Sequence, residues 1–180
     1  NNIKNIIFSS SAAVFGSVNS TKVDENHPKH PLNPYGKTKL IFEKILSENV
    51  KKYNLNAVIL RYFNAAGADS SLEIGEFHDP ETHLIPRIFN NILNLTNTVK
   101  IYGNNHNTKD GTCVRDFIHV NDLVNAHYLA FKKLRYSKGC FDFNLGNGNG
   151  FSVLEIIKSC ELVTKKKVNY EYLNSRAGEP

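Results

Sequence analysis

The sequence has no apolar run long enough to cross a bilayer, and its N-terminal residues lack the pattern of a secretory leader. Its three cysteines, Cys113, Cys140 and Cys160, are too few and too widely spaced for a disulfide framework or a zinc knuckle. Reduced thiols without a membrane segment predict a cytoplasmic protein that does not bind a membrane.

Methionine is absent as well. A complete translated chain begins with Met, whereas this one begins with Asn1 and stops at Pro180, directly after "SRAGEP". We therefore expect the chain to be a piece of a longer protein, with part of the functional machinery outside it.

The chain is basic, with a net charge of +5 and a pI of about 9.0, but it has almost no dense basic runs. The one run, residues 165–167, follows a helical stretch and is typical of a solvated helix end. No basic patch is interleaved with stacking aromatic residues. The sequence therefore predicts no nucleic-acid partner.

What the chain does contain is a strand, helix, strand pattern. Ile3 to Ser9 is an unbroken apolar and β-branched run, typical of a strand buried on both faces. Asn33 is a predicted helix cap and Pro34 a first helical residue, and apolar residues recur at helical spacing up to Tyr53. "NAVILRYF" is the next buried strand. This order predicts a parallel crossover unit and hence an α/β fold with a doubly wound parallel sheet of the Rossmann type.

After "NAAGADSS" the predicted strands become shorter and are separated by polar loops. This part has a predicted helix at 84–93, short strands in "TVKIYG" and "VRDFIHV", and a helix at 122–134. Ser152 and Glu155 predict a capping box at the start of a further helix. We assign residues 1–65 to the C-terminal part of a Rossmann domain. Residues 66–180 are assigned mainly to a smaller α/β substrate-binding lobe, from which about 115–135 return to the first domain.

Tyr35 and Lys39 predict a proton-transfer site. Residues at i and i+4 share one face of a helix, and an ammonium beside a phenol favours the phenolate. An ordinary phenol has a pKa of about 10 and is a poor base without such help. The pair alone is most often a plain helix surface, but Ser11, at the end of the preceding strand, adds a third polar group.

Several segments in order along the chain carry a resemblance: "IFSSSAAVFG", "NPYGKTKL", "LRYFNAAGA", "DGTCVRDFIHVNDL", "NLGNGNGFSVLEI" and "SRAGEP". They resemble the extended short-chain dehydrogenase/reductase family and, within it, the nucleotide-sugar 4-epimerases. The resemblance implies an isomerase with NAD as cofactor that interconverts UDP-glucose and UDP-galactose. It also implies a homodimer built partly on the helix that carries Tyr35, although the apolar face of that helix equally suits packing within one chain.

The resemblance implies a role for individual residues. Tyr35 is the base for the sugar 4-hydroxyl, Lys39 assists it and bonds the nicotinamide ribose, and Ser11 bonds the sugar oxygen. The implied cofactor-binding residues are Tyr35, Lys39, Tyr62, Phe63, Ser9 and Ser10. The implied substrate-binding residues are Ser11, Asn64, His83, Leu84, Lys100, Tyr102, Arg115 and Arg176.

Most of these residues also have a simpler interpretation. Arg115, the expected diphosphate anchor, could instead pair with Asp116, and Asn64 could form a turn. Tyr62 and Phe63 could be strand core, and Tyr102 could be part of an ordinary half-buried strand. His83 stands where the family usually has Asn.

The "GNGNG" segment at 146–150 lacks the dinucleotide spacing and is read as a turn. The other histidines lack metal-ligand spacing, so no metal is predicted.

Two other functions stay open. A nucleotide-sugar 4,6-dehydratase or decarboxylase shares the Tyr and Lys, but dehydratases usually place an Asp–Glu pair after the Ser or Thr, where this chain has Ala12 and Ala13. The second is a fragment without activity of its own. The residues do not decide whether N-acetylhexosamine nucleotides are accepted.

Overall fold

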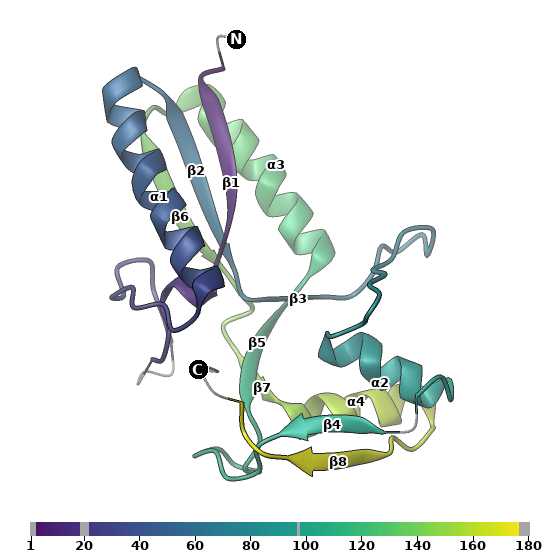
Figure 1. Ribbon diagram of the computed structural model, residues 1–180. Coiled ribbons are helices and arrows are strands. Elements are labelled where there is room, and N and C mark those ends of the chain that lie inside the picture. Colours follow the sequence, from purple (N-terminus) through teal and green to yellow (C-terminus); the bar gives the residue numbers. More distant parts are fainter. Residues whose placement is uncertain (1–2, 19–21, 97, 177–180) are drawn as a thin grey trace. The chain divides into compact units, whose positions relative to one another are not determined.

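The structure, a computed structural model, describes residues 3–18, 22–96 and 98–176. It divides into two compact units, each treated separately below. The first unit comprises the described residues of Asn1–Gly67 and Ile118–Gly148, and the second comprises those of Ala68–Phe117 and Asn149–Ala177 (Figure 1). No described helix is long and apolar enough to cross a membrane.

The first unit contains a parallel sheet with strand order β1-β2-β6, formed by β1 (Asn5–Ser11), β2 (Asn56–Tyr62) and β6 (Cys140–Leu145). The central strand β2 is buried on both faces, since every residue from Ala57 to Leu60 is at most 2% exposed. The parallel α/β fold predicted from the sequence is confirmed.

Two helices cover opposite faces of this sheet, α1 (Pro34–Tyr53) and α3 (Val120–Tyr136) (Figure 1). Successive residues of β2 point to opposite faces. Ala57 and Ile59 therefore pack in one apolar cluster with the α1 residues Leu46 and Val50. Val58 and Leu60 pack in another, with the α3 residues Ala130 and Leu134.

The start of α1 lies against the segment that follows β1. The Asn33 side chain accepts a hydrogen bond of 2.8 Å from the Gly36 amide, and Pro34 begins the helix, which confirms the predicted cap. A short 3₁₀ helix, η1 (Ala12–Val14), follows β1, and a Cβ on Gly36 would collide with the Ala13 carbonyl oxygen. Gly36 thus allows a close approach of α1 to η1.

Strand β3 (Asn64–Ala66), which the sequence did not predict, ends the first part of this unit. The second unit has β4 (Val99–Tyr102) parallel to β8 (Tyr170–Leu173). It also has β5 (Val114–His119), whose last two residues belong to the first unit, antiparallel to β7 (Gly150–Ser152). Its helices are α2 (Leu84–Ile92) and α4 (Val153–Thr164). They share an apolar core with β4 that includes Ile88, Ile101 and Ile157. Ser152 and Glu155 form the predicted capping box.

Candidate active site

The Tyr35–Lys39 pair lies at the carboxyl end of β1. The Lys39 ammonium donates a hydrogen bond of 2.8 Å to the Ser9 carbonyl oxygen. It also lies 5.5 Å from the centroid of the Tyr35 ring and 5.2 Å from that of Phe8. Tyr35 itself is 56% exposed. The structure therefore fixes a positive charge beside an accessible phenol, at the strand end where ligands bind in open α/β sheets.

The three serines of β1 are divided between the two faces of the strand. The half-buried Ser11 accepts a hydrogen bond of 3.2 Å from the Ala13 amide and caps η1. Ser9 is exposed, whereas Ser10 is 2% exposed and donates to Glu43. Side chains alternate along a strand, so Ser9 and Ser11 are on one face and Ser10 on the other. The Ser10 hydroxyl is thus buried in a hydrogen bond to the helix α1.

Tyr62 and His127 form a second polar group around Ser9. The Tyr62 hydroxyl lies 2.7 Å from Ser9 Oγ and 2.6 Å from His127 Nε2. Burial raises the pKa of Tyr62, the hydrogen bond with Ser9 lowers it in part, and the nearby Tyr35 phenol raises it further. Ser9 is therefore contacted by α1 through its carbonyl and by β2 and α3 through its side chain.

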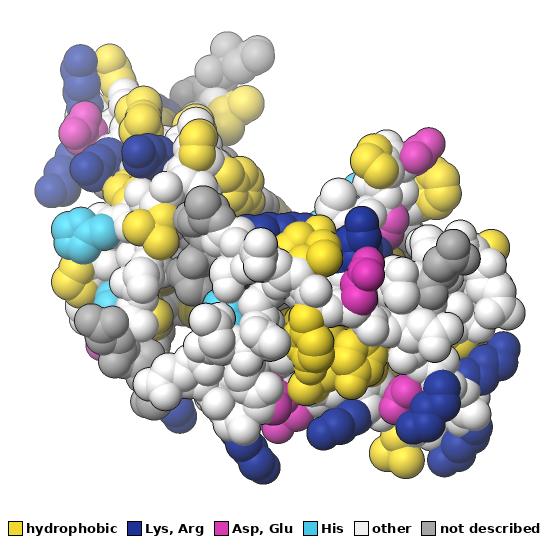
Figure 2. Space-filling model, turned by 60° about the horizontal axis from the view of Figure 1, so that its bottom comes forward, with side chains coloured by type: hydrophobic (Ala, Val, Ile, Leu, Met, Phe, Trp, Pro, Cys, Tyr) yellow, Lys and Arg dark blue, Asp and Glu magenta, His cyan; other side chains and the backbone are white. Residues whose placement is uncertain are grey.

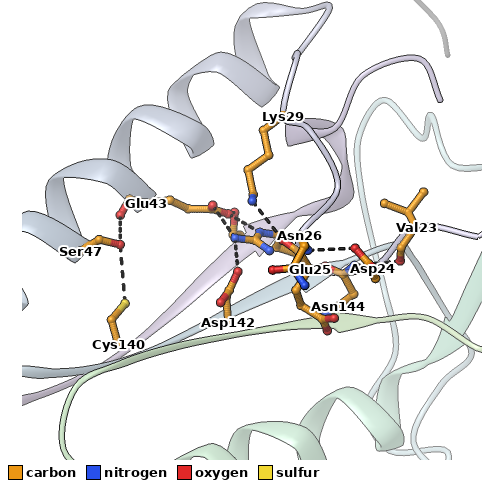
Figure 3. Close-up of polar contacts among 12 residues, drawn as sticks. Val23, Asp24, Glu25, Asn26, Lys29, Glu43, Ser47, Cys140, Asp142 and Asn144 are labelled. Carbon is orange, nitrogen blue, oxygen red and sulfur yellow. Dashed lines mark hydrogen bonds and ion pairs between the residues drawn. The ribbon is translucent and has the colours of Figure 1, made fainter.

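A buried ion cluster lies one helical turn beyond Lys39. The Arg61 Nε and Nη2 atoms each donate a 2.9 Å hydrogen bond to the Glu43 carboxylate, and Nη2 also lies 2.7 Å from Asp142 Oδ2. Figure 3 shows Glu43 reaching into the cluster from its helix and Asp142 from its strand. Burial opposes the charge on Arg61, but Glu43 and Asp142 outweigh it and raise the Arg61 pKa. This cluster ties α1 to β2 and β6.

The segment that precedes α1 is attached to the same sheet at the end of β6. The Asn144 amide nitrogen donates to Glu25 Oε1 at 2.7 Å, and Asn144 Nδ2 donates to the Val23 carbonyl at 3.0 Å (Figure 3). Phe63, the residue after β2, extends the hydrogen bonding between β2 and β6, since its amide donates to the Leu145 carbonyl at 3.1 Å. Asn64, the next expected site residue, is half-buried at the start of β3.

In the second unit the structure brings two of the expected residues together. The Arg176 guanidinium lies 3.5 Å from the Tyr102 ring centroid. Arg176, and to a smaller extent Arg87, lower the pKa of the Tyr102 hydroxyl. Arg87 was not predicted from the sequence, because a single Arg inside an apolar helical pattern carries no distinguishing signal. Tyr102 thus has two cations beside it.

The other expected residues of this unit are Lys100, Arg115, His83 and Leu84. Lys100 is exposed on β4, and Arg115 Nη1 donates a 3.2 Å hydrogen bond to the Val114 carbonyl. His83 occupies the cap position of α2 but makes no capping hydrogen bond through its side chain, and Leu84 is the first helical residue.

The imidazole of His83 belongs to a cluster with two carboxylates and a second histidine. Its Nδ1 lies 2.9 Å from Glu81 Oε1 and 3.2 Å from Glu76 Oε1, and His78 Nε2 lies 2.9 Å from the same Glu76 atom. One ligand atom each from Glu76, His78 and His83 fall within 4.8 Å of one another. These exposed groups hydrogen-bond to each other, which accounts for their closeness, and the absence of a metal stays a prediction.

Basic side chains are dispersed on the face shown in Figure 2, where Lys and Arg occupy several separate places among uncharged and hydrophobic groups. The absence of a nucleic-acid partner stays a prediction.

A parallel α/β sheet with helices on both faces, and with a Tyr–Lys pair and serines at the end of β1, defines a Rossmann-type α/β protein with a candidate site at a strand end. The NAD dependent epimerase/dehydratase family matches residues 1–146, and the chain belongs to this family. The resemblance expected from the sequence is thereby confirmed.

The chain is 48% identical to the UDP-glucose 4-epimerase of Halalkalibacterium halodurans, over 99% of this chain and 53% of that protein. It is 45% identical to the UDP-glucose 4-epimerase from Brucella ovis, solved in complex with NAD, with a TM-score of 0.93 over 98% of this chain and 55% of that one. The Bifidobacterium longum enzyme, solved with NAD+ and UDP, is 36% identical with a TM-score of 0.89 over 99% of this chain and 54% of that one. The chain thus spans about half the length of the relatives it matches.

Proposed function

We propose that the full-length protein containing this chain is an NAD-dependent epimerase that interconverts UDP-glucose and UDP-galactose by inverting C4 of the hexose. The observation that carries the proposal is the Lys39 ammonium, bonded to the Ser9 carbonyl and next to the Tyr35 ring. The similarity to UDP-glucose 4-epimerases, one of them solved in complex with NAD, supports the substrate and the cofactor.

The polar groups at the end of β1 and β2 suit a nicotinamide riboside. An ammonium and two hydroxyls, from Lys39, Ser9 and Tyr62, offer donors and acceptors for ribose hydroxyls and a carboxamide. Lys39 and Tyr62 would hold the cofactor at this place, together with Phe63. Bound NAD would supply reversible hydride transfer at the sugar carbon.

Tyr35 takes the proton of the sugar 4-hydroxyl in this proposal and later gives it back. The Lys39 charge stabilises the negative charge that develops on the phenolic oxygen, and its fixed position costs no reorganisation during the reaction. Ser11 bonds the sugar oxygen and orients it. A 4,6-dehydratase is disfavoured, because the residues after Ser11 in η1 are Ala12 and Ala13, which carry no carboxylate.

The second unit is proposed to hold the UDP part. Arg115 and Arg176 suit the diphosphate because a guanidinium binds two phosphate oxygens at once. Tyr102 offers a ring face to the uracil, and the His83 and Lys100 side chains and the Leu84 backbone contribute polar contacts. Asn64, a residue of the first unit, is proposed as a further substrate contact. We further propose a cytoplasmic homodimer.

The test is conversion of UDP-galactose to UDP-glucose by the full-length protein with Tyr35→Phe. Loss of a positioned base lowers turnover by roughly 10²–10⁴-fold. Tyr53→Phe is the matched control, because Tyr53 is on the same helix and is 52% exposed against 56% for Tyr35. Turnover of Tyr35→Phe near that of the control would refute the assigned base.

A further inference from the structure

We propose that His127 is a positioning residue of the active site, which fixes the Tyr62 hydroxyl and, through it, the Ser9 side chain. The effect of His127 on catalysis rests on the proposed function, whereas the hydrogen bond between His127 and Tyr62 is independent of that function. His127 is on α3, on the face of the sheet opposite α1, and the sequence patterns had left it as a histidine without a role.

The hydrogen-bond partners determine where the proton of the ring lies. His127 Nδ1 is 2.7 Å from the Leu123 carbonyl oxygen, one turn earlier on the same helix. A carbonyl only accepts, so Nδ1 carries the hydrogen. In the neutral ring Nε2 is then an acceptor, and it faces the Tyr62 hydroxyl at 2.6 Å. Backbone and phenol therefore hold the ring in a single tautomer.

The Tyr62 hydroxyl has one proton, which gives the network a direction. Tyr62 donates to Ser9 Oγ across 2.7 Å; with His127 neutral, Tyr62 would turn its proton to His127 Nε2 at 2.6 Å, and Ser9 would then donate to the Tyr62 oxygen. With His127 protonated, Nε2 donates to Tyr62 and Tyr62 donates to Ser9. Either direction satisfies all three groups, so the position of the phenol oxygen is fixed in both protonation states.

The His127–Tyr62–Ser9 network does more than attach α3 to the sheet, because it lies beside the Tyr35–Lys39 pair. The Tyr62 hydroxyl lies 2.7 Å from Ser9 Oγ. Ser9 carries the carbonyl that accepts from Lys39. Loss of the His127 ring nitrogen frees the Tyr62 hydroxyl and the Ser9 side chain directly beside the Tyr35–Lys39 pair, while the apolar packing of Ala130 and Leu134 stays in place.

The first experiment measures the contact in the full-length protein without added substrate. Nitrogen-detected NMR of the imidazoles is expected to show His127 as the Nδ1–H tautomer, with an Nε2 signal that moves in Tyr62→Phe. An Nε2 signal unaffected by Tyr62→Phe would overturn the proposal. This result does not depend on whether the protein is an epimerase.

The second experiment is a double-mutant cycle on epimerase turnover. His127→Phe keeps a ring of similar size but has no acceptor, and we expect it to lower kcat about tenfold with a smaller change in KM, as expected for loss of one hydrogen bond. His127→Gln, whose amide can still bond a hydroxyl, is expected to recover most of the loss. Tyr62→Phe should lower turnover as well, and adding His127→Phe to it should cost little more.

Additive losses in the double variant, or no recovery in His127→Gln, would show that His127 does not act through Tyr62. Unfolding midpoints of the variants accompany the rates, because a purely structural histidine would change stability and turnover together. If the parent protein does not epimerise UDP-galactose, the proposed function fails, and the NMR result still decides the His127–Tyr62 contact.

Discussion

Glu43 and Arg61 form two parallel hydrogen bonds of 2.9 Å with both side chains almost fully buried. Glu43 is one helical turn after Lys39 and two turns after Tyr35, and Arg61 directly precedes Tyr62. The buried pair therefore sets the position of the face of α1 that carries the Tyr–Lys pair relative to β2.

Glu43→Gln should destabilise the protein strongly, because it leaves the buried Arg61 guanidinium with only Asp142 as a charged partner. Removing one partner of a buried ion pair costs about 3–5 kcal/mol. The free energy of unfolding in denaturant is the measurement, and Glu48→Gln, at an exposed position of the same helix, is the control with an expected change within about 0.5 kcal/mol. Equal effects of the two variants would contradict the role of the pair.

Gly36→Ala should move the start of α1 away from η1. An alanine is favoured over glycine in a helix by about 1 kcal/mol, but the added Cβ would collide with the Ala13 carbonyl oxygen, which cannot rotate away. We expect a net loss of stability and a lower turnover, because the adjacent Tyr35 moves with the helix end.

Gly75→Ala is the matched control for this prediction, because a Cβ there meets no atom within 4 Å. Circular dichroism melts and epimerase rates compare the two variants. A Gly36→Ala protein as stable and as active as Gly75→Ala would mean that the close approach is not required.

Asp110 should make the second unit sensitive to acid. Burial alone would raise its pKa, but hydrogen bonds from the Ser152 hydroxyl and from the hydroxyl and amide of Thr112 lower it below its usual value. A carboxylate with a lowered folded-state pKa contributes stability above its unfolded value of about 4, and this contribution is lost as the pH falls through the folded value.

Asp110→Asn should therefore be less stable than the parent near neutral pH, and the difference should shrink below about pH 4. Denaturant unfolding at several pH values measures it. A difference in unfolding free energy that stays constant on acidification would show that the ionised carboxylate is not the stabilising form.

Arg176→Ala should raise the pKa of Tyr102 and weaken UDP binding. The guanidinium stacks 3.5 Å from the ring centroid and is the main cause of the lowered pKa of this hydroxyl. Ultraviolet difference titration follows the phenolate, and calorimetry with UDP follows binding in the full-length protein. Arg135→Ala, which removes a looser contact of 5.8 Å with the Tyr136 ring in α3, is the control and should leave UDP affinity unchanged.

Much of the first unit could be predicted because its signals are local. The apolar run of β1 and the capped helix α1 follow from neighbouring residues in the sequence. The i, i+4 spacing of Tyr35 and Lys39 likewise requires no knowledge of the sheet. The three-residue β3 was missed, because so short a strand has no period of its own.

His127 and the Glu43–Arg61 pair could not be predicted in the same way. Their partners are far away in the sequence, since Tyr62 and His127 are 65 residues apart and Glu43 and Arg61 are 18 apart. Which side chains meet depends on the parallel register of β1, β2 and β6, in which Ser9 pairs with Leu60 and Arg61 with Asn144.

The sequence by itself determined the alternation of strands and helices, the helix caps and the placement of a phenol and an ammonium on one helical face, because these depend on periods of two and 3.6 residues along the chain. Only the tertiary structure decided that Ser9 is the point where Lys39, Tyr62 and His127 converge. The physical reason is that strand register and the packing of α1 and α3 on opposite faces fix those distances, and neither is encoded in any one segment.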